Sequence, residues 1–359
     1  MKAKEKAGLP AIPKAGLPAG FGAGLPAFGG ARGDRVLPAR SMAGFTIIEL
    51  LVAIALGLII LASLFRTFKV QQDSYVTQDQ ISAMQQNLRA AMYLITRDLQ
   101  MAGYYTNFDG NNITMDWNGD GTVDASEQNR RPLILARNNV TAAGDNIRDG
   151  TDEIVIVKAS RGEGRLLTGG ESAAGTSINL GWDLDGQSGD DLNTTGKMYG
   201  VLVKNDLSRA ELFHLGGGGT LERSLNESYS ADASVPSLSD RVHRADIVIY
   251  RVDDSNPARP CLVRRNLGSD NGFQTVAENI ENLQFRYQLV DGSWVDNPAD
   301  NQNRVRAVEI LLVGRTAYPQ RGYRDTTSIT FGGAPIPVPN DAYRRRVLTS
   351  LVKTRNIGL

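Results

Sequence analysis

The feature that most constrains this chain is an apolar run close to its N-terminus. The run extends over 21 residues, from Phe45 to Phe65, and Glu49 carries its only charge. At a rise of ~1.5 Å per residue, a helix of this length reaches about 30 Å, which is enough to cross the hydrocarbon core of a bilayer. A carboxylate in such a place costs on the order of 2.5–3.5 kcal/mol, and ionisable groups there usually have a partner and a function. Because the run itself offers no cation, Glu49 is expected to find its partner elsewhere.

The start of this run has the pattern of a processing signal. Residues 44–50 read Gly-Phe-Thr-x-x-Glu-Leu. This segment resembles the class III N-terminal methylation motif of type IV prepilins and type II secretion pseudopilins. The resemblance implies that a membrane aspartyl prepilin peptidase cleaves between Gly44 and Phe45, that Phe45 is then N-methylated, and that Glu49 pairs with the N-terminal amine of a neighbouring subunit in a helical filament. An ordinary signal anchor with one stray glutamate is the alternative interpretation.

Residues 1–44 have the composition of a basic leader peptide, to be cleaved from the mature protein. They carry a net charge of +5, and the rest of the chain carries −5. Basic residues before an apolar span predict a cytoplasmic N-terminus and an exported remainder. Within the leader, Ala-Gly-Leu-Pro recurs at 7–10, 15–18 and 23–26, and this density of glycine and proline predicts disorder. The mildly acidic remainder gives no electrostatic reason to expect nucleic acid as a partner.

Past the apolar run, the sequence pattern predicts that the helix continues. Apolar residues recur there in steps of three or four, which is one stripe of an amphipathic helix. The stripe consists of Ile81, Met84, Leu88, Met92, Ile95, Leu99 and Ala102. Gly103 is a natural stop. We therefore expect one long helix, with a transmembrane and filament-core half over 45–65 and an amphipathic half over 66–103.

The end of this helix carries a second family resemblance. Residues 97–104 read Arg-Asp-Leu-Gln-Met-Ala-Gly-Tyr and resemble a segment typical of PilW-type minor pilins. Segments at 276–287, 306–313 and 343–349 resemble the same chains and the related J-type pseudopilins. The resemblance implies a type IV pilin fold of the α+β class, in which the long N-terminal helix packs on a largely antiparallel sheet. A helix end with a solvated Arg97/Asp98 pair is the alternative interpretation of residues 97–104.

The residues after the helix, 104–359, are predicted to form short apolar strands separated by polar loops. Seven strand candidates lie at 153–158, 200–204, 246–251, 261–265, 283–289, 304–313 and 345–353. In one of them Leu283, Phe285, Tyr287 and Leu289 are expected to point inward, and Gln284, Arg286 and Gln288 outward. Because no amphipathic helices separate the strands, an antiparallel sheet is favoured over parallel βαβ units.

One loop has the pattern of a calcium site. Residues 116–127 match the twelve-residue loop Asp-x-Asn-x-Asp-Gly-x₅-Glu at every defining position. Its expected ligands are Asp116, Asn118, Asp120, the carbonyl of Thr122, Asp124 and Glu127, which together supply the oxygens that Ca²⁺ prefers. Polar flanks and Pro132 leave no room for a complete EF-hand, so we expect an isolated loop. A solvated turn without metal is the alternative.

A weaker second metal candidate lies at 183–191. It offers the carboxylates of Asp183, Asp185 and Asp190 and a turn glycine, but it lacks the register of a calcium loop.

The chain has few residues suited to catalysis. His214 and His243 are its only histidines and Cys261 its only cysteine, so no internal disulfide forms. We expect His214 to be structural on a strand, His243 to be solvated and Cys261 to be a small buried hydrophobe. No nucleophile elbow, His/Cys metal spacing or phosphate loop is present, which predicts a protein that is not an enzyme. The arginines at 344–346 are expected to form ion pairs or a solvated edge rather than to bind DNA.

The sequence therefore predicts a PilW-type minor pilin that acts in the initiation or tip complex of a type IV pilus. Its expected partners are the prepilin peptidase, other minor pilins and the major pilin, inner-membrane lipid before assembly, and an adhesin at the tip. It is expected to span the inner membrane once and then to reach the cell surface in the pilus. Two alternatives remain open: a minor pseudopilin of a type II secretion system, and a calcium-dependent adhesin or DNA-uptake module on a prepilin anchor.

Overall fold

The computed structural model describes the following residues: 44–106, 133–141, 146–159, 165–166, 175, 198–215, 225, 227–231, 234–235, 238–267 and 272–357. The chain divides into two units, Met1–Leu64 and Phe65–Leu359, and each is described by itself.

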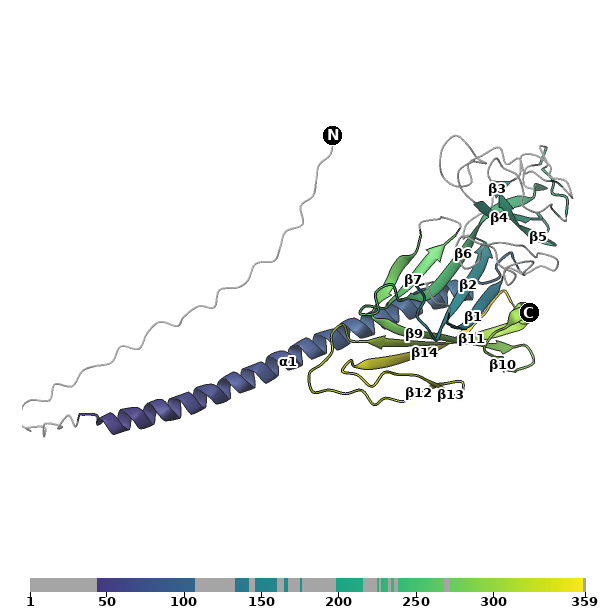
Figure 1. Ribbon diagram of the computed structural model, residues 1–359. Helices are drawn as coiled ribbons and strands as arrows, with labels where there is room; N and C mark the ends of the chain where they lie inside the picture. The colour runs from purple at the N-terminus through teal and green to yellow at the C-terminus, as the bar shows by residue number, and fades with distance from the viewer. Residues whose placement is uncertain are drawn as a thin grey trace, which may run out of the picture. The chain divides into compact units, whose positions relative to one another are not determined.

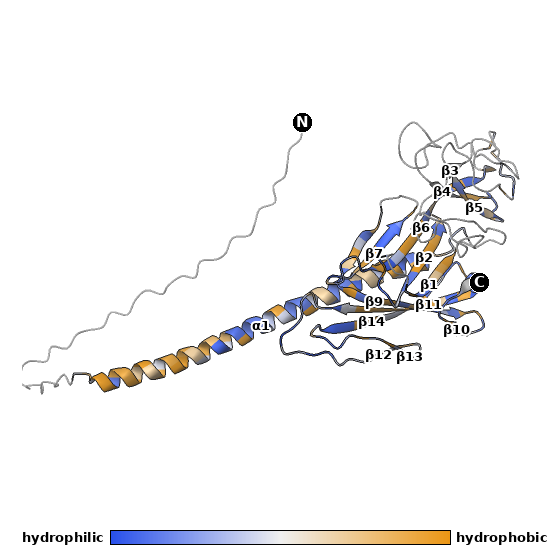
Figure 2. Ribbon diagram, in the orientation of Figure 1, coloured by the Kyte–Doolittle hydropathy of each residue, from blue (hydrophilic) through white to orange (hydrophobic). Residues whose placement is uncertain are grey.

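A single long helix, α1 (Ile47–Gln100), carries both the apolar run and the amphipathic stripe. It begins two residues after the expected start and ends three residues before the expected end, Gly103. Figure 2 shows the start of α1 almost entirely in hydrophobic colours, whereas its later turns mix polar and apolar residues. In the part of the chain that the structure describes, α1 is the one helix long and apolar enough to cross a membrane, and none of its most apolar window is buried.

The strands follow α1 in chain order. Those of the first half are β1 (Ile134–Val140), β2 (Thr151–Ala159), β3 (Arg165–Leu166), β4 (Met198–Val203), β5 (Ala210–Leu215), β6 (Arg241–Asp253) and β7 (Cys261–Asn266). The second half contains β8 (Gln274–Glu278), β9 (Ile280–Leu289), β10 (Trp294–Val295), the 3₁₀ helix η2 (Ala299–Arg304), β11 (Val305–Arg315), β12 (Ile329–Phe331), β13 (Ala334–Ile336) and β14 (Arg345–Lys353).

Eight strands form a sheet organised around the 13-residue strand β6 (Figure 1). The first residues of β6, 241–244, pair with β4, which continues to β5. Its later residues pair with β2 and with β7, which continue to β1 and β8. Each of these pairings is antiparallel, which confirms the expected sheet type.

A second sheet has four strands in the order β10-β9-β11-β14, again with antiparallel pairing throughout. On the outward face of β11, Leu311 and Val313 pack against Ile329 of the two-stranded β12–β13 sheet. On its other face the sheet turns Leu283, Phe285 and further apolar side chains toward the helix.

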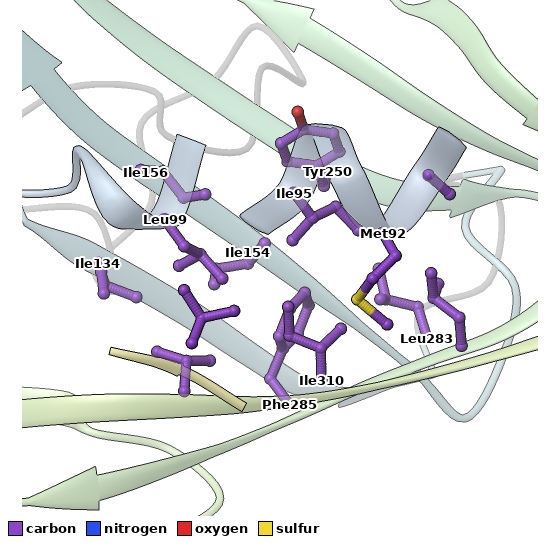
Figure 3. Close-up of a cluster of buried hydrophobic side chains, with 14 of the residues drawn as sticks. Met92, Ile95, Leu99, Ile134, Ile154, Ile156, Tyr250, Leu283, Phe285 and Ile310 are labelled. Atoms are coloured by element: carbon purple, nitrogen blue, oxygen red, sulfur yellow. The ribbon is translucent and has the colours of Figure 1, made fainter. Parts of the chain in front are cut away.

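The main core lies between α1 and the two sheets. Figure 3 shows Met92, Ile95 and Leu99 of α1 facing side chains of both sheets. The predicted stripe is confirmed: six of its seven residues are buried, and Ile81 is partly buried against the same core. At roughly 1.5–3 kcal/mol for each large apolar side chain removed from water, this stripe is the main attachment of the helix.

The strand predicted from the apolar run at 153–158 is β2, and its position in the fold explains why apolar residues follow one another without alternation. Ile154 and Ile156 of β2 face the core beneath α1, whereas Val155 and Val157 face a second apolar cluster on the opposite side of the sheet. Because both faces of this strand are covered, every residue of β2 is buried, and polar alternation is absent.

The other predicted strands are also present, but two details differ. The strands β1 and β8 were not predicted, since each mixes apolar and polar residues without a regular alternation. The short strands β3, β10, β12 and β13, of two or three residues each, were not predicted either. Gln284, expected on the outward face, is buried and its Nε2 donates to the carbonyl oxygen of Gly150 at 2.8 Å. A loop of the eight-stranded sheet thus covers that part of the outward face.

Gly103 illustrates why the helix ends where it does. Its φ is +76°, and a Cβ placed on it would lie 2.7 Å from Cγ1 of Ile357. Gly150 has a similar φ, +72°, but an added Cβ there would meet nothing within 4 Å. A substitution at Gly150 therefore tests backbone strain alone, whereas a substitution at Gly103 tests backbone strain together with close packing.

We predict that Gly103→Ala lowers the free energy of unfolding more than Gly150→Ala does. Both variants incur the ~1–2 kcal/mol cost of a left-handed residue, and the variant at Gly103 adds about 1–3 kcal/mol for overpacking against Ile357. Urea unfolding of the full-length protein in mild detergent measures both. Equal losses would show that Ile357 yields without cost.

Candidate functional site

Residues 44–50, which resemble the N-terminal methylation motif and which we call the assembly motif, lie at the start of α1, where Thr46 and Glu49 form a capping box. The backbone N–H of Thr46 donates to Oε2 of Glu49 at 2.9 Å, and the Thr46 hydroxyl donates to the same oxygen at 2.9 Å. The backbone N–H of Glu49 points back toward the Thr46 hydroxyl, at 3.3 Å. This reciprocal pattern satisfies N–H groups that have no partner within the helix.

The capping box gives Glu49 a role that the sequence interpretation missed. Thr-x-x-Glu immediately before an apolar helix is itself a signature of a helix start, so Thr46 could have been singled out from the sequence. The pairing of Glu49 with the amine of a neighbouring subunit stays a prediction, as do cleavage at Gly44 and methylation of Phe45.

The other end of α1 is joined to the eight-stranded sheet through Asp98. Its Oδ1 accepts from Nζ of Lys158 on β2 at 2.6 Å. Its Oδ2 accepts from the hydroxyl of Tyr250 on β6 at 2.7 Å and from Nε of Arg264 on β7 at 3.2 Å. We call these four residues the Asp98 cluster. The solvated Arg97/Asp98 pair considered above is wrong for Asp98, which is buried.

Charge compensation keeps this buried carboxylate ionised. Burial acts to raise the pKa of Asp98, but the charge and hydrogen bond of Lys158, the Tyr250 hydroxyl and the charge of Arg264 bring it below its ordinary value. The pKa of Tyr250 is raised by burial and by the adjacent Asp98 charge, so its hydroxyl remains a donor. The cluster is therefore a fully charged, directional contact inside the domain.

The remaining residues of the 97–104 segment have distinct roles. Ala102 is buried, and Nδ2 of Asn356 approaches its carbonyl oxygen at 3.4 Å. The N–H of Gly103 donates to the Val157 carbonyl at 2.9 Å, and Tyr104 accepts from the N–H of Ala159 at 2.8 Å. The turn after α1 thus pairs with the end of β2, and the segment joins helix and sheet.

Of the arginines at 344–346, expected to form ion pairs or a solvated edge, Arg345 forms buried ion pairs and Arg346 is exposed. Arg345 donates to the carboxylates of Glu281, Asp325 and Asp341, which come from three different segments. These interactions raise the pKa of Arg345 further above its ordinary value, against the effect of burial. Arg344 donates to Gln320 and lies over the ring of Tyr323. Arg345 is thus occupied by structural contacts.

The histidines and the cysteine fit a structural role. His214 is buried on β5 and stacks on Tyr199 with ring centroids 4.1 Å apart. The expectation that His243 is solvated is wrong: it is buried beside Tyr105, and burial lowers its pKa. Cys261 is half-buried rather than buried, and burial raises the pKa of its thiol, which disfavours the reactive thiolate.

Both predicted metal sites, at 116–127 and at 183–191, lie outside the described residues. Within the described ranges, no group of three or more His, Cys, Asp or Glu side chains could hold a metal ion.

Comparisons with known proteins support the sequence resemblance at both ends of the chain. Residues 249–356 match the family model of type IV pilus-assembly protein W, and residues 39–65 match that of the prokaryotic N-terminal methylation motif. No curated protein matches the chain. Among solved structures, the type IV-like pilin TTHA1219 from Thermus thermophilus is 11% identical, with coverage of 76% of this chain and 97% of that one, at a TM-score of 0.33. That similarity is too low to carry an argument.

The two family matches confirm the resemblance to PilW-type chains with a prepilin motif. They describe a structural pilus-assembly protein, in agreement with the expectation that the chain is not an enzyme. The motif implies processing by a prepilin peptidase and assembly with other pilins, and it is consistent with anchoring in the inner membrane before assembly.

The Asp98 cluster yields a testable consequence for stability. We predict that Asp98→Ala lowers the free energy of unfolding by about 3–5 kcal/mol, because it leaves the buried Lys158 and the half-buried Arg264 without their counter-charge. Since the pKa of Asp98 lies below the ordinary 3.8, its contribution is complete above that value and is lost as pH falls through the lower folded-state pKa. Unfolding measured as a function of pH tests both statements.

Asp79→Ala is the matched control, since Asp79 is an exposed acidic residue on the same helix. A comparable loss in both variants would contradict the assignment.

Proposed function

We propose that this chain is a minor pilin that acts in the initiation or tip complex of a type IV pilus. The observation that carries the proposal is the start of α1: a wholly exposed apolar helix with one carboxylate, directly after a prepilin cleavage motif. An exposed apolar surface of this size needs a bilayer or the apolar helices of other subunits around it.

Glu49 explains how such a helix would find its place among others. In an apolar surrounding, a carboxylate without a counter-charge is costly. Cleavage after Gly44 creates an amine on Phe45, and a subunit that places Glu49 beside the amine of its neighbour removes this cost. The apolar helix thus supplies the driving force for assembly, and Glu49 sets the position along the filament.

The size of the exported part favours a minor role. Residues 104–359 follow the helix, and a bulky subunit suits a few copies at one end better than a repeating position in a thin fibre. The partners would be the prepilin peptidase, other minor pilins, the major pilin and an adhesin at the tip. Deletion should then reduce the number of pili. Loss of protein secretion with pili intact would instead favour the type II secretion pseudopilin.

The central test separates the charge of Glu49 from its capping role. Glu49→Gln keeps a side chain that serves in capping boxes but removes the charge. We predict that Glu49→Gln and Glu49→Ala are both cleaved near the wild-type level but enter filaments several-fold less well. The measurement compares processed subunit in membranes with subunit in sheared pili.

Thr46→Val is the matched control, because it removes the hydroxyl of the box and leaves the Glu49 charge. It should be incorporated better than either Glu49 variant. Normal incorporation of Glu49→Gln, or equal defects in all three variants, would leave the capping box as the whole role of Glu49.

We also propose that residues 116–127 bind calcium and thereby stabilise the exported part. The support is the sequence pattern alone, with four carboxylates in twelve residues at the spacing of a calcium loop. A ligand present at 100 times its dissociation constant adds about 2.7 kcal/mol to the stability of the state that binds it.

The full-length protein should therefore melt at a higher temperature in millimolar Ca²⁺ than in EDTA, and Asp120→Ala should abolish the difference. Asp185→Ala tests the weaker second candidate in the same way. An unchanged melting temperature of the wild type would identify 116–127 as a solvated turn.

A further inference from the structure

A cavity of about 550 Å³ opens beside the Asp98 cluster, at the end of α1. Its lining comes from five elements of the second unit: α1, β2, the neighbouring strands β6 and β7, and β8. Charged groups on the lining are Arg97, Asp98, Lys158, Asp246 and Arg264. Three are cations and two are acids, so the cavity carries a net positive charge.

The two acids and one of the cations are already engaged. Asp98 accepts three hydrogen bonds from the cluster that bears its name. Asp246 accepts from Nδ2 of Asn266 at 2.9 Å. Lys158 is 10% exposed and donates to Asp98. These groups form one wall of the cavity, in which Lys158 offsets the charge of Asp98.

The two arginines differ from this wall because they retain free donors. All hydrogen bonds of Arg264 in the described part of the chain pass through Nε, and its side chain is 29% exposed. Its two terminal nitrogens therefore have donors to spare, while Nε holds the guanidinium in place. Arg97 is exposed, and none of its hydrogen bonds or ion pairs falls among the described residues.

The other lining residues are of two kinds. Leu94, Met101 and Val276 are apolar, whereas Gln274 and Thr275 can donate or accept. The cavity is far larger than a single oxyanion needs and lies in the size range of small-molecule sites. Its chemistry thus combines an anion-binding end with an apolar wall.

We propose that this cavity binds a small organic anion through Arg97 and Arg264. A carboxylate or phosphate group would accept from the free guanidinium donors, which match planar, bidentate recognition of such groups. The apolar body of the ligand would lie against Leu94, Met101 and Val276. This site is separate from the assembly motif, and it does not depend on the pilin assignment.

Thermal unfolding of the full-length protein in mild detergent tests the proposal with three probes of similar size. Phenyl phosphate and phenylacetate each carry an oxyanion on an aromatic body, and benzyl alcohol is the neutral analogue. At constant ionic strength, at least one of the anions should raise the melting temperature by several degrees and saturate, and benzyl alcohol should not. The stronger anion identifies the head group as phosphate or carboxylate.

Arg97→Gln should abolish this rise. Because Arg97 is exposed and glutamine is a good helix former, the variant should fold normally without ligand. Arg89→Gln, which removes another exposed arginine of α1 outside the cavity, should keep the full response. Failure of both anions to raise the wild-type melting temperature, or an equal rise in Arg97→Gln, would overturn the proposal.

Discussion

The carboxylate of Asp98 is the contact on which the position of the helix depends. The apolar stripe of α1 supplies most of the attraction to the sheets, but hydrophobic contact has no direction and tolerates sliding. Asp98 removes that freedom, because it must meet Lys158, Tyr250 and Arg264 on three separate strands at once. Burying the Asp98 carboxylate without these partners would be unfavourable. The cluster therefore fixes both the rotation of α1 about its axis and its position along that axis.

The two sheets also meet through apolar packing combined with a few buried, directional polar contacts. Asp152 on β2 accepts the backbone N–H of Phe285 on β9 at 2.7 Å, and burial raises the pKa of Asp152 to about 6. Glu281 on β9 is shared by Arg345 and by Arg148, which also reaches Asp254. Apolar side chains fill the space between the layers, and a small number of buried charges specify how the layers are aligned. Hydrogen-bond donors meet each of these carboxylates and reduce the cost of burying it.

The sequence allowed prediction of the features that depend on periodicity. The helix and its stripe follow from spacing, and β2 and β9 follow from compact or alternating apolar runs. The Asp98 cluster could not be predicted, since Lys158, Tyr250 and Arg264 lie 60 to 166 residues away and no local pattern marks them. His243 was misjudged for a related reason: its arginine neighbours suggest solvent, but the length of β6 places it beneath Tyr105. The capping box differs from both, because its pattern Thr-x-x-Glu is local and marks the helix start in the sequence itself.

The capping box also bears on the order of events at the membrane. Thr46 and Glu49 both lie after the bond between Gly44 and Phe45, so every group that starts the helix belongs to the mature chain. In the proposed processing, removal of the leader would leave these capping groups in place and would turn the amide nitrogen of Phe45 into an ammonium group. That new charge sits at the positive end of the helix dipole, where cations are unfavourable. In the proposed processing, proteolysis would thus act as an electrostatic trigger, because the new positive charge at the helix start would favour the approach of an acidic group.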